Sequence, residues 1–277
     1  MKRARMSTDE TDRSHTFLVC VKYTLDVEEI KVNPATGGPN LELATHRIND
    51  FDENGIEAAL KLRDGHGGRV LALSVMAERP PDNVLLRALA MGVDELHVVC
   101  DPVLADCDAM AMASILGALV GKLGPFDLLV CSDTSVDEYR GEVGPRLAEE
   151  LGLPSVTHVT EIAFAHDVVR ADRVLESWLE TVEVTPPALL TVGSETNDPR
   201  LPTLRQIRQA DKKPIVEWLL ADLVPGDVYS GCGSRIETLA MYAPPSARKR
   251  MVVTGEDHDE VARKLVDHLL EDAAIRL

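Results

Sequence analysis

The residues best suited to chemistry lie in a polar turn within DLLVCSDTSVDEYRGEVGPRLAEELG, residues 127–152. The apolar start of this stretch predicts a buried strand, and its end predicts a helix. Phosphates bind where such a strand ends in a glycine-bearing turn, because the first backbone N–H groups of the following helix lack partners. Gly141 would let a phosphate approach the N–H groups of residues 140–143, and Arg140 would add a guanidinium. The turn is therefore a candidate phosphate site.

The same turn is rich in carboxylates, which oppose an anion. Glu142 would repel a phosphate unless its side chain points to solvent. Asp133, Asp137 and Glu138 could bind a metal ion, but acidic residues are also favoured at helix starts by the helix dipole and by capping. We therefore predict no metal site, and these residues alone leave open both a nucleotide site and a solvated acidic turn.

Catalytic groups are sparse in the rest of the sequence. Motifs of the GxSxG, GxxxxGK[ST], GxGxxG and H-x-x-x-H types are absent, and the eight histidines are scattered. His158 and Tyr139 could act as a general acid or base, but isolated residues of these types are more often structural. We therefore expect no catalysis by this chain alone.

Composition excludes some classes of protein. Lys and Arg number 29 and Asp and Glu number 46, so the formal charge is 29 − 46 = −17, which argues against nucleic-acid binding. No apolar run reaches about 18 residues, so no membrane span is predicted. No CxxC pair occurs, and we expect buried free thiols in a reducing cytoplasm. The five cysteines are Cys20, Cys100, Cys107, Cys131 and Cys232.

Strands and helices alternate four times before residue 152, which predicts a doubly wound, mostly parallel α/β sheet. Apolar runs predict strands at 16–25, 69–76, 95–100 and 126–131. Helical spacing predicts helices within 49–68, 81–92, 107–124 and 141–152, and a hairpin is expected within 28–43, turning at 36–38. Ligands of such sheets bind beyond the carboxyl ends of the strands, here at 23–26, 75–77, 100–101 and 132–137.

The pattern changes after Gly152. Residues 154–192 alternate without a helical period and predict an antiparallel ribbon of three or four strands that returns to the sheet at 187–192. A polar loop follows at about 193–213, and we expect the tail beyond it to leave the core. The tail closes with an amphipathic helix at about 259–275. Its apolar face consists of Val261, Leu265, Val266, Leu269 and Leu270.

The chain resembles the beta subunit of electron transfer flavoprotein, in the FixA-type family, from about residue 17 to 223. The resemblance rests on several motifs in order, of which ALAMGVD and NDPRLPTLRQI are the most specific together. The others are CVKYTLD, INDFDENGIEAALKLRD, GEVGPRLAEELGLPSVTHV, PALLTVGSE and VEWLLADL. The resemblance implies an adenine-nucleotide alpha-hydrolase-like sheet, with a tail at 1–15, a domain at 16–223 and a C-terminal arm at 224–277 that wraps a partner subunit.

The family resemblance implies a heterodimer with an alpha subunit that holds the redox FAD. Electrons would pass from a flavin-dependent dehydrogenase, such as an acyl-CoA dehydrogenase, to an electron-accepting quinone oxidoreductase. The beta subunit would also bind AMP or a second FAD. The residues that match the family's nucleotide contacts are Cys20, Lys22, Asn49, Asp50, Phe51, Asp52, Val75, Ser132, Asp137, Arg140, Gly141, Glu142 and Val143. In the loop, Leu204 would be the apolar anchor for the dehydrogenase, flanked by Arg205 and Arg208.

The chain departs from the family pattern at the turn. SDTSVD replaces G-[KR]-Q-A-x-D, so that Asp133 stands where a basic residue is usual, and Glu142 replaces the usual Gln. Asp50 replaces a Pro, and Val27 replaces an aromatic residue. The nucleotide is thus left open between AMP, FAD and an altered or empty pocket. A nucleotide-binding sensor of the universal-stress type and an adenylate-transferring ligase are alternatives, but the sensor would lack the loop and arm, and no ligase loop is present.

Overall fold

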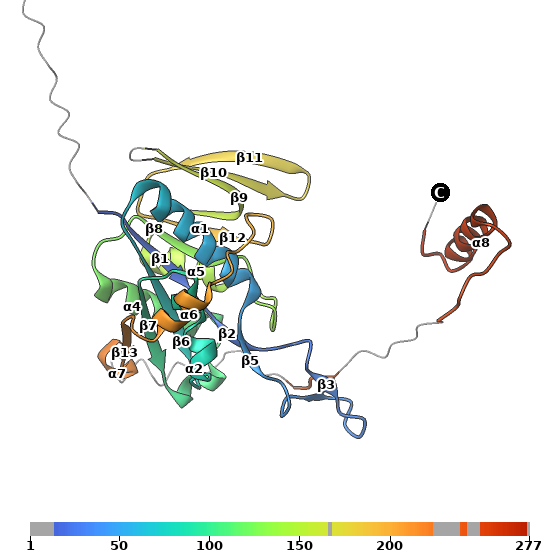
Figure 1. Ribbon diagram of the computed structural model, residues 1–277, viewed down its shortest axis with the longest axis horizontal. Helices are drawn as coiled ribbons and strands as arrows, with labels where there is room; N and C mark the ends of the chain where they lie inside the picture. Colours follow the sequence, from blue (N-terminus) through green and yellow to red (C-terminus); the bar gives the residue numbers. More distant parts are fainter. Residues whose placement is uncertain (1–13, 166–167, 224–238, 243–249, 276–277) are drawn as a thin grey trace, which may run out of the picture.

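A nine-stranded sheet forms the centre of the molecule. The computed structural model describes residues 14–165, 168–223, 239–242 and 250–275. The strand order is β11-β10-β9-β12-β8-β1-β6-β7-β13 (Figure 1). Its parallel core consists of β1 (Thr16–Cys20), β6 (Arg69–Met76), β7 (Glu95–Cys100) and β8 (Leu128–Ser132), which pair in parallel as predicted. These strands are apolar almost throughout because helices cover both faces.

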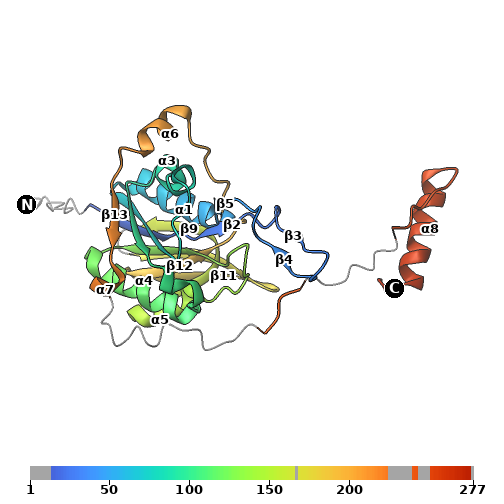
Figure 2. The same ribbon diagram turned by 90° about the horizontal axis from the view of Figure 1, so that it is seen from below.

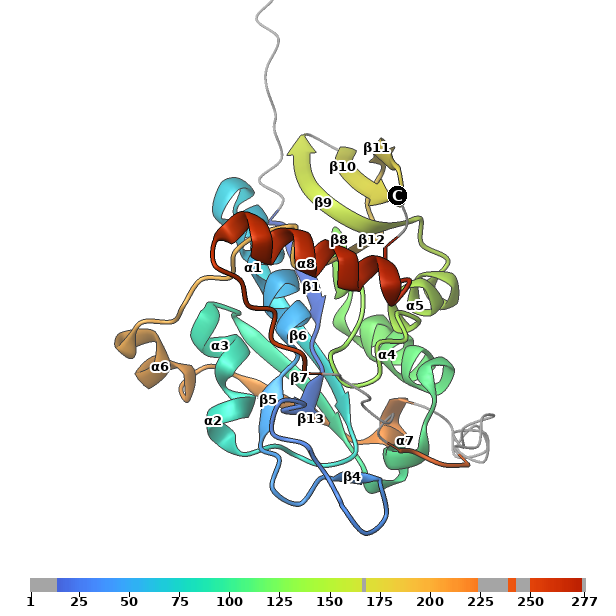
Figure 3. The same ribbon diagram turned by 90° about the vertical axis from the view of Figure 1, so that its right-hand side faces the viewer.

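The helices form two layers. On one face lie α1 (Asp50–His66), α2 (Asp82–Leu85) and α3 (Arg87–Met91), and on the other lie α4 (Ala109–Leu123) and α5 (Val143–Leu151). Figure 2 shows α1 and α3 above the sheet and α4 and α5 below it, and Figure 3 shows the same two layers seen end on. The predicted doubly wound α/β class is therefore confirmed.

The predicted strand at 16–25 and the predicted helix at 81–92 are each divided into two elements in the structure. The apolar run 16–25 was predicted as one strand, but β1 ends at Cys20, and β2 (Tyr23–Leu25) pairs with β5 (His46–Ile48) in a separate sheet. The predicted helix at 81–92 is split at Leu86 into α2 and α3. The Tyr23 hydroxyl donates to the Leu85 carbonyl at 2.9 Å, so a side chain enters the helical hydrogen-bond ladder next to the break.

The hairpin and the ribbon agree with the prediction. β3 (Lys31–Val32) and β4 (Pro39–Asn40) pair in antiparallel fashion around Gly37, which has φ 71°. β9 (Ser155–Ala165), β10 (Val168–Leu175) and β11 (Trp178–Val184) form the antiparallel ribbon. β12 (Ala188–Val192) returns the chain to the sheet and pairs in parallel with β8 and β9.

The segment after the 193–213 loop does not leave the core, contrary to the prediction. β13 (Ile215–Trp218) pairs in parallel with β7 and forms the edge of the sheet, and α7 (Leu220–Leu223) buries Leu220. Trp218 donates its indole N–H to Nδ1 of the buried His97 at 3.1 Å. Four residues are too few to show a periodicity, so this edge strand depends on its tertiary partner.

The C-terminal helix is shorter than predicted. α8 (His258–Glu271) replaces the expected 259–275, and none of its residues is buried, although its apolar residues do lie at helical spacing. Figure 1 shows α8 standing apart from the sheet. Parts of the predicted arm, at 224–238, 243–249 and 276–277, and most of the N-terminal tail, at 1–13, lie outside the described residues.

The cysteines differ in exposure. Cys20 and Cys131 are buried as predicted, but Cys107 is half-buried and Cys100 is exposed. Cys100 is the last residue of β7, and the pairing with β13 stops one residue earlier, at Val99, so its side chain lacks cover on that side. Cys232 lies outside the described residues. Among the described helices, none is long and apolar enough to cross a membrane.

Candidate functional site

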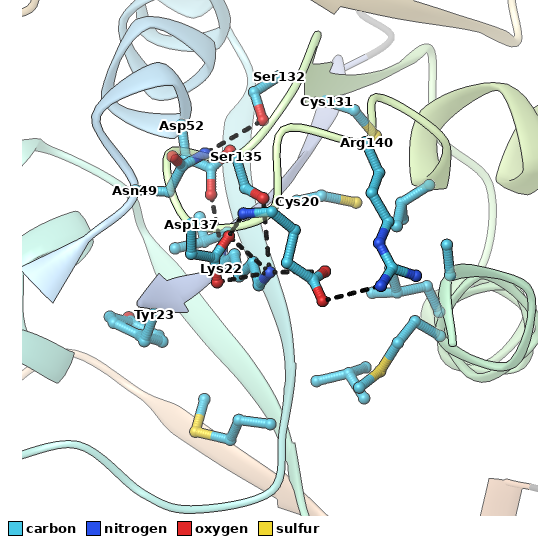
Figure 4. Close-up of a pocket in the computed structure, with 18 of the residues that line it drawn as sticks. Cys20, Lys22, Tyr23, Asn49, Asp52, Cys131, Ser132, Ser135, Asp137 and Arg140 are labelled. Carbon is cyan, nitrogen blue, oxygen red and sulfur yellow. Dashed lines mark hydrogen bonds and ion pairs between the residues drawn. The ribbon is translucent and has the colours of Figure 1, made fainter. Parts of the chain in front are cut away.

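A cavity of about 370 Å³ lies at the carboxyl ends of β1, β6 and β8 (Figure 4). Its walls are the β1–β2 connection, the end of β6 and the 132–144 turn, with the start of α4 and a 3-10 helix, η1 (Pro102–Asp106), on the remaining side. Cavities of this size hold small ligands, and the ends of parallel strands are where α/β sheets place them.

The cavity gathers most of the residues that the sequence pattern selected. The predicted residues that line it are Cys20, Lys22, Asn49, Asp52, Val75, Ser132, Asp137, Arg140, Gly141, Glu142 and Val143. Asp50 and Phe51 do not line it. The Asp50 carboxylate pairs with Arg47, and the Phe51 ring packs edge-on against Tyr139 with 6.0 Å between ring centroids.

Lys22 lines the cavity and is paired with two carboxylates of the 132–144 turn. Its ammonium lies 2.8 Å from one carboxylate oxygen of Asp137 and 3.4 Å from Oε2 of Glu138. Burial would raise the pKa of Asp137, but the hydrogen bonds from Lys22 and Ser135 hold it below its ordinary value. Asp137 is therefore a counter-ion of Lys22 rather than a free negative charge in the cavity (Figure 4).

Asn49 fixes the 132–137 turn from the start of α1. It is fully buried, its amide donates to the Thr134 carbonyl at 3.1 Å, and its Oδ1 accepts from the Val136 N–H at 3.0 Å. Its own N–H donates to the Lys22 carbonyl at 2.9 Å. One side chain thus joins the ends of β1 and β8, which gives the cavity a fixed shape.

Asp52 lies one helical turn further along α1, also buried. Its Oδ2 accepts the Lys22 backbone N–H at 2.6 Å. Burial raises the pKa of Asp52 to about 6, and the hydrogen bonds from Ser132, Lys22 and Asn49 only partly oppose this effect. The Asp52 carboxyl group therefore titrates close to neutral pH at the floor of the site.

The two acids of the turn that depart from the family pattern are both engaged by other residues. Asp133 accepts the His158 N–H at 3.0 Å and also the Thr191 hydroxyl, so its carboxylate is tied to β9 and β12. Glu142 accepts from Nη2 of Arg146 at 2.6 Å, one turn along α5. These partners offset the repulsion that the sequence alone predicts at the turn.

The turn presents donors without protein acceptors. Among the hydrogen bonds of the described residues, none is donated by the backbone N–H groups of Gly141, Glu142 or Val143. Gly141 has φ +65°, and a Cβ there would lie 3.0 Å from the Asp133 carbonyl oxygen. The buried Thr134 hydroxyl also has no hydrogen-bond partner among the residues that the structure describes. Within the described part of the chain, the one ion pair of Arg140 is with Glu138 at 3.6 Å, which leaves its guanidinium accessible.

The apolar and sulfur-bearing side of the cavity was missed by sequence reasoning. Its residues are Leu73, Leu104, Cys107, Met112, Leu116 and Cys131. The hydrogen bond to Cys20, together with burial, raises the pKa of Cys131 well above its ordinary value, so this thiol carries no charge. The apolar residues of the 107–124 helix were a usable signal, but the sequence pattern predicted only a helix there.

The predicted docking residues lie outside the cavity. Leu204 and Arg205 are the first two residues of α6 (Leu204–Ala210), and both side chains are exposed. Arg208 lies in the last turn of the same helix. Within the described residues, no group of three or more His, Cys, Asp or Glu side chains is placed to hold a metal ion. His158 is held by Asp133, and Tyr139 is packed on Phe51.

Comparisons with known proteins match the sequence of this chain to one family. The family model of the electron transfer flavoprotein domain matches residues 41–223. The chain is 32% identical to the caffeyl-CoA reductase-Etf complex subunit CarD of Acetobacterium woodii, over 92% of this chain and 98% of that protein.

Two further relatives are named electron transfer flavoprotein subunit beta. One, from Thermoanaerobacterium thermosaccharolyticum, is 33% identical over 91% of this chain and 97% of its own length. The other, from Bacillus subtilis, is 32% identical over 94% and 99%. These matches favour the flavoprotein interpretation over the sensor alternative. The chain belongs to the electron transfer flavoprotein family, as a relative of its beta subunits.

Proposed function

We propose that this protein is the beta subunit of a two-subunit electron carrier, and that its cavity binds an adenine nucleotide. The family membership supports the carrier role and an alpha subunit as the partner. When bound to the complex, FAD supplies the one- and two-electron redox chemistry. The residues of this chain then orient and insulate the cofactors rather than catalyse a reaction.

The observation that carries the nucleotide proposal is the set of unpaired donors at one end of the cavity. The Gly141–Val143 N–H groups have no protein acceptor within the described part of the chain, and the Arg140 guanidinium is only weakly paired. A phosphate or pyrophosphate fits these donors, and Gly141 leaves space for its close approach. The apolar side lined by Leu73, Leu104 and Met112 suits a planar base.

We propose that the nucleotide is AMP or the AMP half of a second FAD. Both carry the adenine, ribose and phosphate that the cavity and its donors would accommodate. The proposed electron donor is a flavin-dependent dehydrogenase, such as an acyl-CoA dehydrogenase, and the acceptor is a quinone oxidoreductase. Leu204, which is 75% exposed, supports the proposal that the 193–213 loop docks the dehydrogenase.

The test is to purify this chain in complex with its alpha subunit and to identify the released nucleotides by absorbance and mass. One FAD and one AMP per complex would support an ordinary carrier, and two FAD would support a carrier with a flavin in this cavity. One FAD without a second nucleotide would contradict the cavity proposal. A complex without flavin would contradict the carrier proposal.

Arg140→Glu tests the position of the phosphate. We expect the nucleotide of the cavity to bind at least tenfold more weakly, because one charge-assisted hydrogen bond is worth about 1.5–3 kcal/mol and a repulsive charge replaces it. The matched control is Lys122→Glu, which reverses an exposed charge in the last turn of α4, outside the cavity. Equal nucleotide occupancy in the two variants would place the phosphate elsewhere.

A further inference from the structure

Two buried polar residues of α1 support the 193–213 loop rather than the cavity. Asn54 is 5% exposed and exchanges hydrogen bonds with Asn197. Its amide donates to the Asn197 carbonyl at 2.6 Å, and the Asn197 amide donates to the Asn54 carbonyl at 3.0 Å. A side chain such as Asn54, buried in the helical layer, needs such partners. The exchange fixes the backbone where the loop leaves β12.

Glu57, one turn along α1, makes the stronger contact. It is 4% exposed, and its Oε2 accepts from the Arg200 side chain at 2.6 Å and from the Arg200 backbone N–H at 3.2 Å. Its Oε1 accepts from Nη2 of Arg200 at 3.1 Å, and Arg200 also reaches Asp64 at 3.0 Å. This bidentate pair fixes both the side chain and the backbone of Arg200.

The far end of the loop is fixed as well. Lys213 donates to the Leu89 carbonyl at 2.9 Å and to the Val93 carbonyl at 2.6 Å, around the end of α3. Between the two ends, Thr203 and Gln206 form a capping box that starts α6. The loop is therefore held at both ends and contains its own helix.

The tip of this fixed loop is apolar and uncovered. Leu201 is 81% exposed, Leu204 75% and Ile207 50%, and all three lie between the two ends. A loop that covered the core of its own chain would bury these side chains. Three exposed apolar side chains on a rigid support instead match an anchor that inserts into another protein.

We propose that Asn54, Glu57, Asn197 and Arg200 form a positioning clamp, the loop clamp, that presents the apolar tip in its docking conformation. The inference rests on the proposed docking of a flavin-dependent dehydrogenase. A loop without the clamp would lose conformational entropy when it docked, whereas the clamp has ordered it beforehand. Glu57 and Arg200 are thus positioning residues, since neither lines the cavity nor belongs to the exposed tip.

Glu57→Gln is the test, and Glu53→Gln is its matched control. Glu53 lies one turn earlier on α1 and forms a comparable pair with Arg87 at 2.7 Å, but within the described structure it has no hydrogen bond or ion pair with the loop. Both variants remove one carboxylate from an α1 ion pair. Each is purified as the complex with the alpha subunit, and flavin content and unfolding temperature are measured first.

The decisive readout is steady-state electron transfer from a purified acyl-CoA dehydrogenase at varied concentrations of the complex. Glu57→Gln should raise the KM for the complex roughly tenfold with kcat unchanged, because docking and not the redox step is affected. Glu53→Gln should leave KM within about twofold. If Glu57→Gln does not yield a complex, Arg200→Gln takes its place, because Arg200 is half-exposed and its substitution disturbs the core less.

Leu204→Ala distinguishes the clamp proposal from the docking proposal on which it rests. A raised KM for both Leu204→Ala and Glu57→Gln, but not for Glu53→Gln, would support the clamp. A raised KM for Leu204→Ala alone, or an equal rise for Glu57→Gln and Glu53→Gln, would overturn the clamp and leave the docking site intact. An unchanged KM for Leu204→Ala would overturn the docking role itself.

Discussion

At the scale of single residues, the site is defined by charges that are already paired. Lys22 is balanced by Asp137, Asp133 is held by Thr191 and the His158 N–H, and Glu142 is held by Arg146. Such pairs leave the Arg140 guanidinium and the backbone donors of the turn as the groups available to an anion. The formal charge of a turn is therefore a poor guide to its binding preference.

Asp52 gives a prediction about pH. Its pKa in the folded protein is about 6, against an ordinary value of 3.8, so the folded state binds more protons than the unfolded state between these values. The contribution of Asp52 to the free energy of unfolding is therefore greatest below pH 3.8 and is lost as pH rises through 6. The loss is at most about 3 kcal/mol for a shift of this size.

Asp52→Asn should remove this pH dependence. We expect the difference in unfolding free energy between the variant and the parent to shift in favour of the variant by about 2 kcal/mol from pH 4 to pH 7.5. Urea unfolding of both proteins at several pH values measures this difference in unfolding free energy. Parallel curves for the two proteins would mean that Asp52 does not titrate in this window.

At the scale of elements, two glycines in the α4 and α5 layer have opposite roles. A Cβ at Gly144, in the first turn of α5, would lie 2.7 Å from the Thr191 side chain of β12. A Cβ at Gly121, in α4, would meet nothing within 4 Å. The first glycine allows close packing of a helix on the sheet, and the second only weakens a helix.

Gly144→Ala should therefore destabilise the protein by about 1–3 kcal/mol, because α5 must move away from β12. It should also weaken nucleotide binding, since the same movement shifts the donors of the turn. Gly121→Ala, the matched substitution, should stabilise the protein by about 0.5–1 kcal/mol. Calorimetry of both variants checks the signs, and a neutral Gly144→Ala would contradict the close packing.

At the scale of the whole molecule, the α/β body and the C-terminal helix differ in how they are stabilised. The body has buried residues on both faces of the sheet, whereas α8 has none. An amphipathic helix without burial in its own chain is expected to gain its stability from a partner. This difference supports the proposed division at residue 223, with the alpha subunit as the partner of the arm.

A chain that ends at Leu223 should still fold into the α/β body but should bind the alpha subunit more weakly. We expect its unfolding temperature to stay within a few degrees of the full chain, while complex formation with the alpha subunit falls. A chain that ends at Pro214 is the control, because it also removes β13 and the buried Leu220. It should unfold at a clearly lower temperature. Full complex formation by the Leu223 chain would contradict the proposed arm.

The local pattern of the sequence determined much of this protein. The alternation of apolar runs and helical periods predicted the parallel core, and β9 to β12 were expected from their alternation. The rule that ligands of α/β sheets bind beyond the strand ends predicted one edge for the turns that hold Asn49 and Arg140, and both residues line the cavity there. These predictions succeed because burial imposes a period on neighbouring residues, which a single sequence displays.

Only the tertiary structure decided which partners the charged side chains have. Asp133 meets Thr191 across 58 positions, Arg200 meets Glu57 across 143, and β13 is a strand only because β7 lies beside it. Asp50 and Phe51 were also placed outside the cavity by their contacts with Arg47 and Tyr139. Such contacts join residues that are far apart in the chain, so no local period reveals them. The fold that brings these residues together decides which charged groups of the site are paired and which remain available to a ligand.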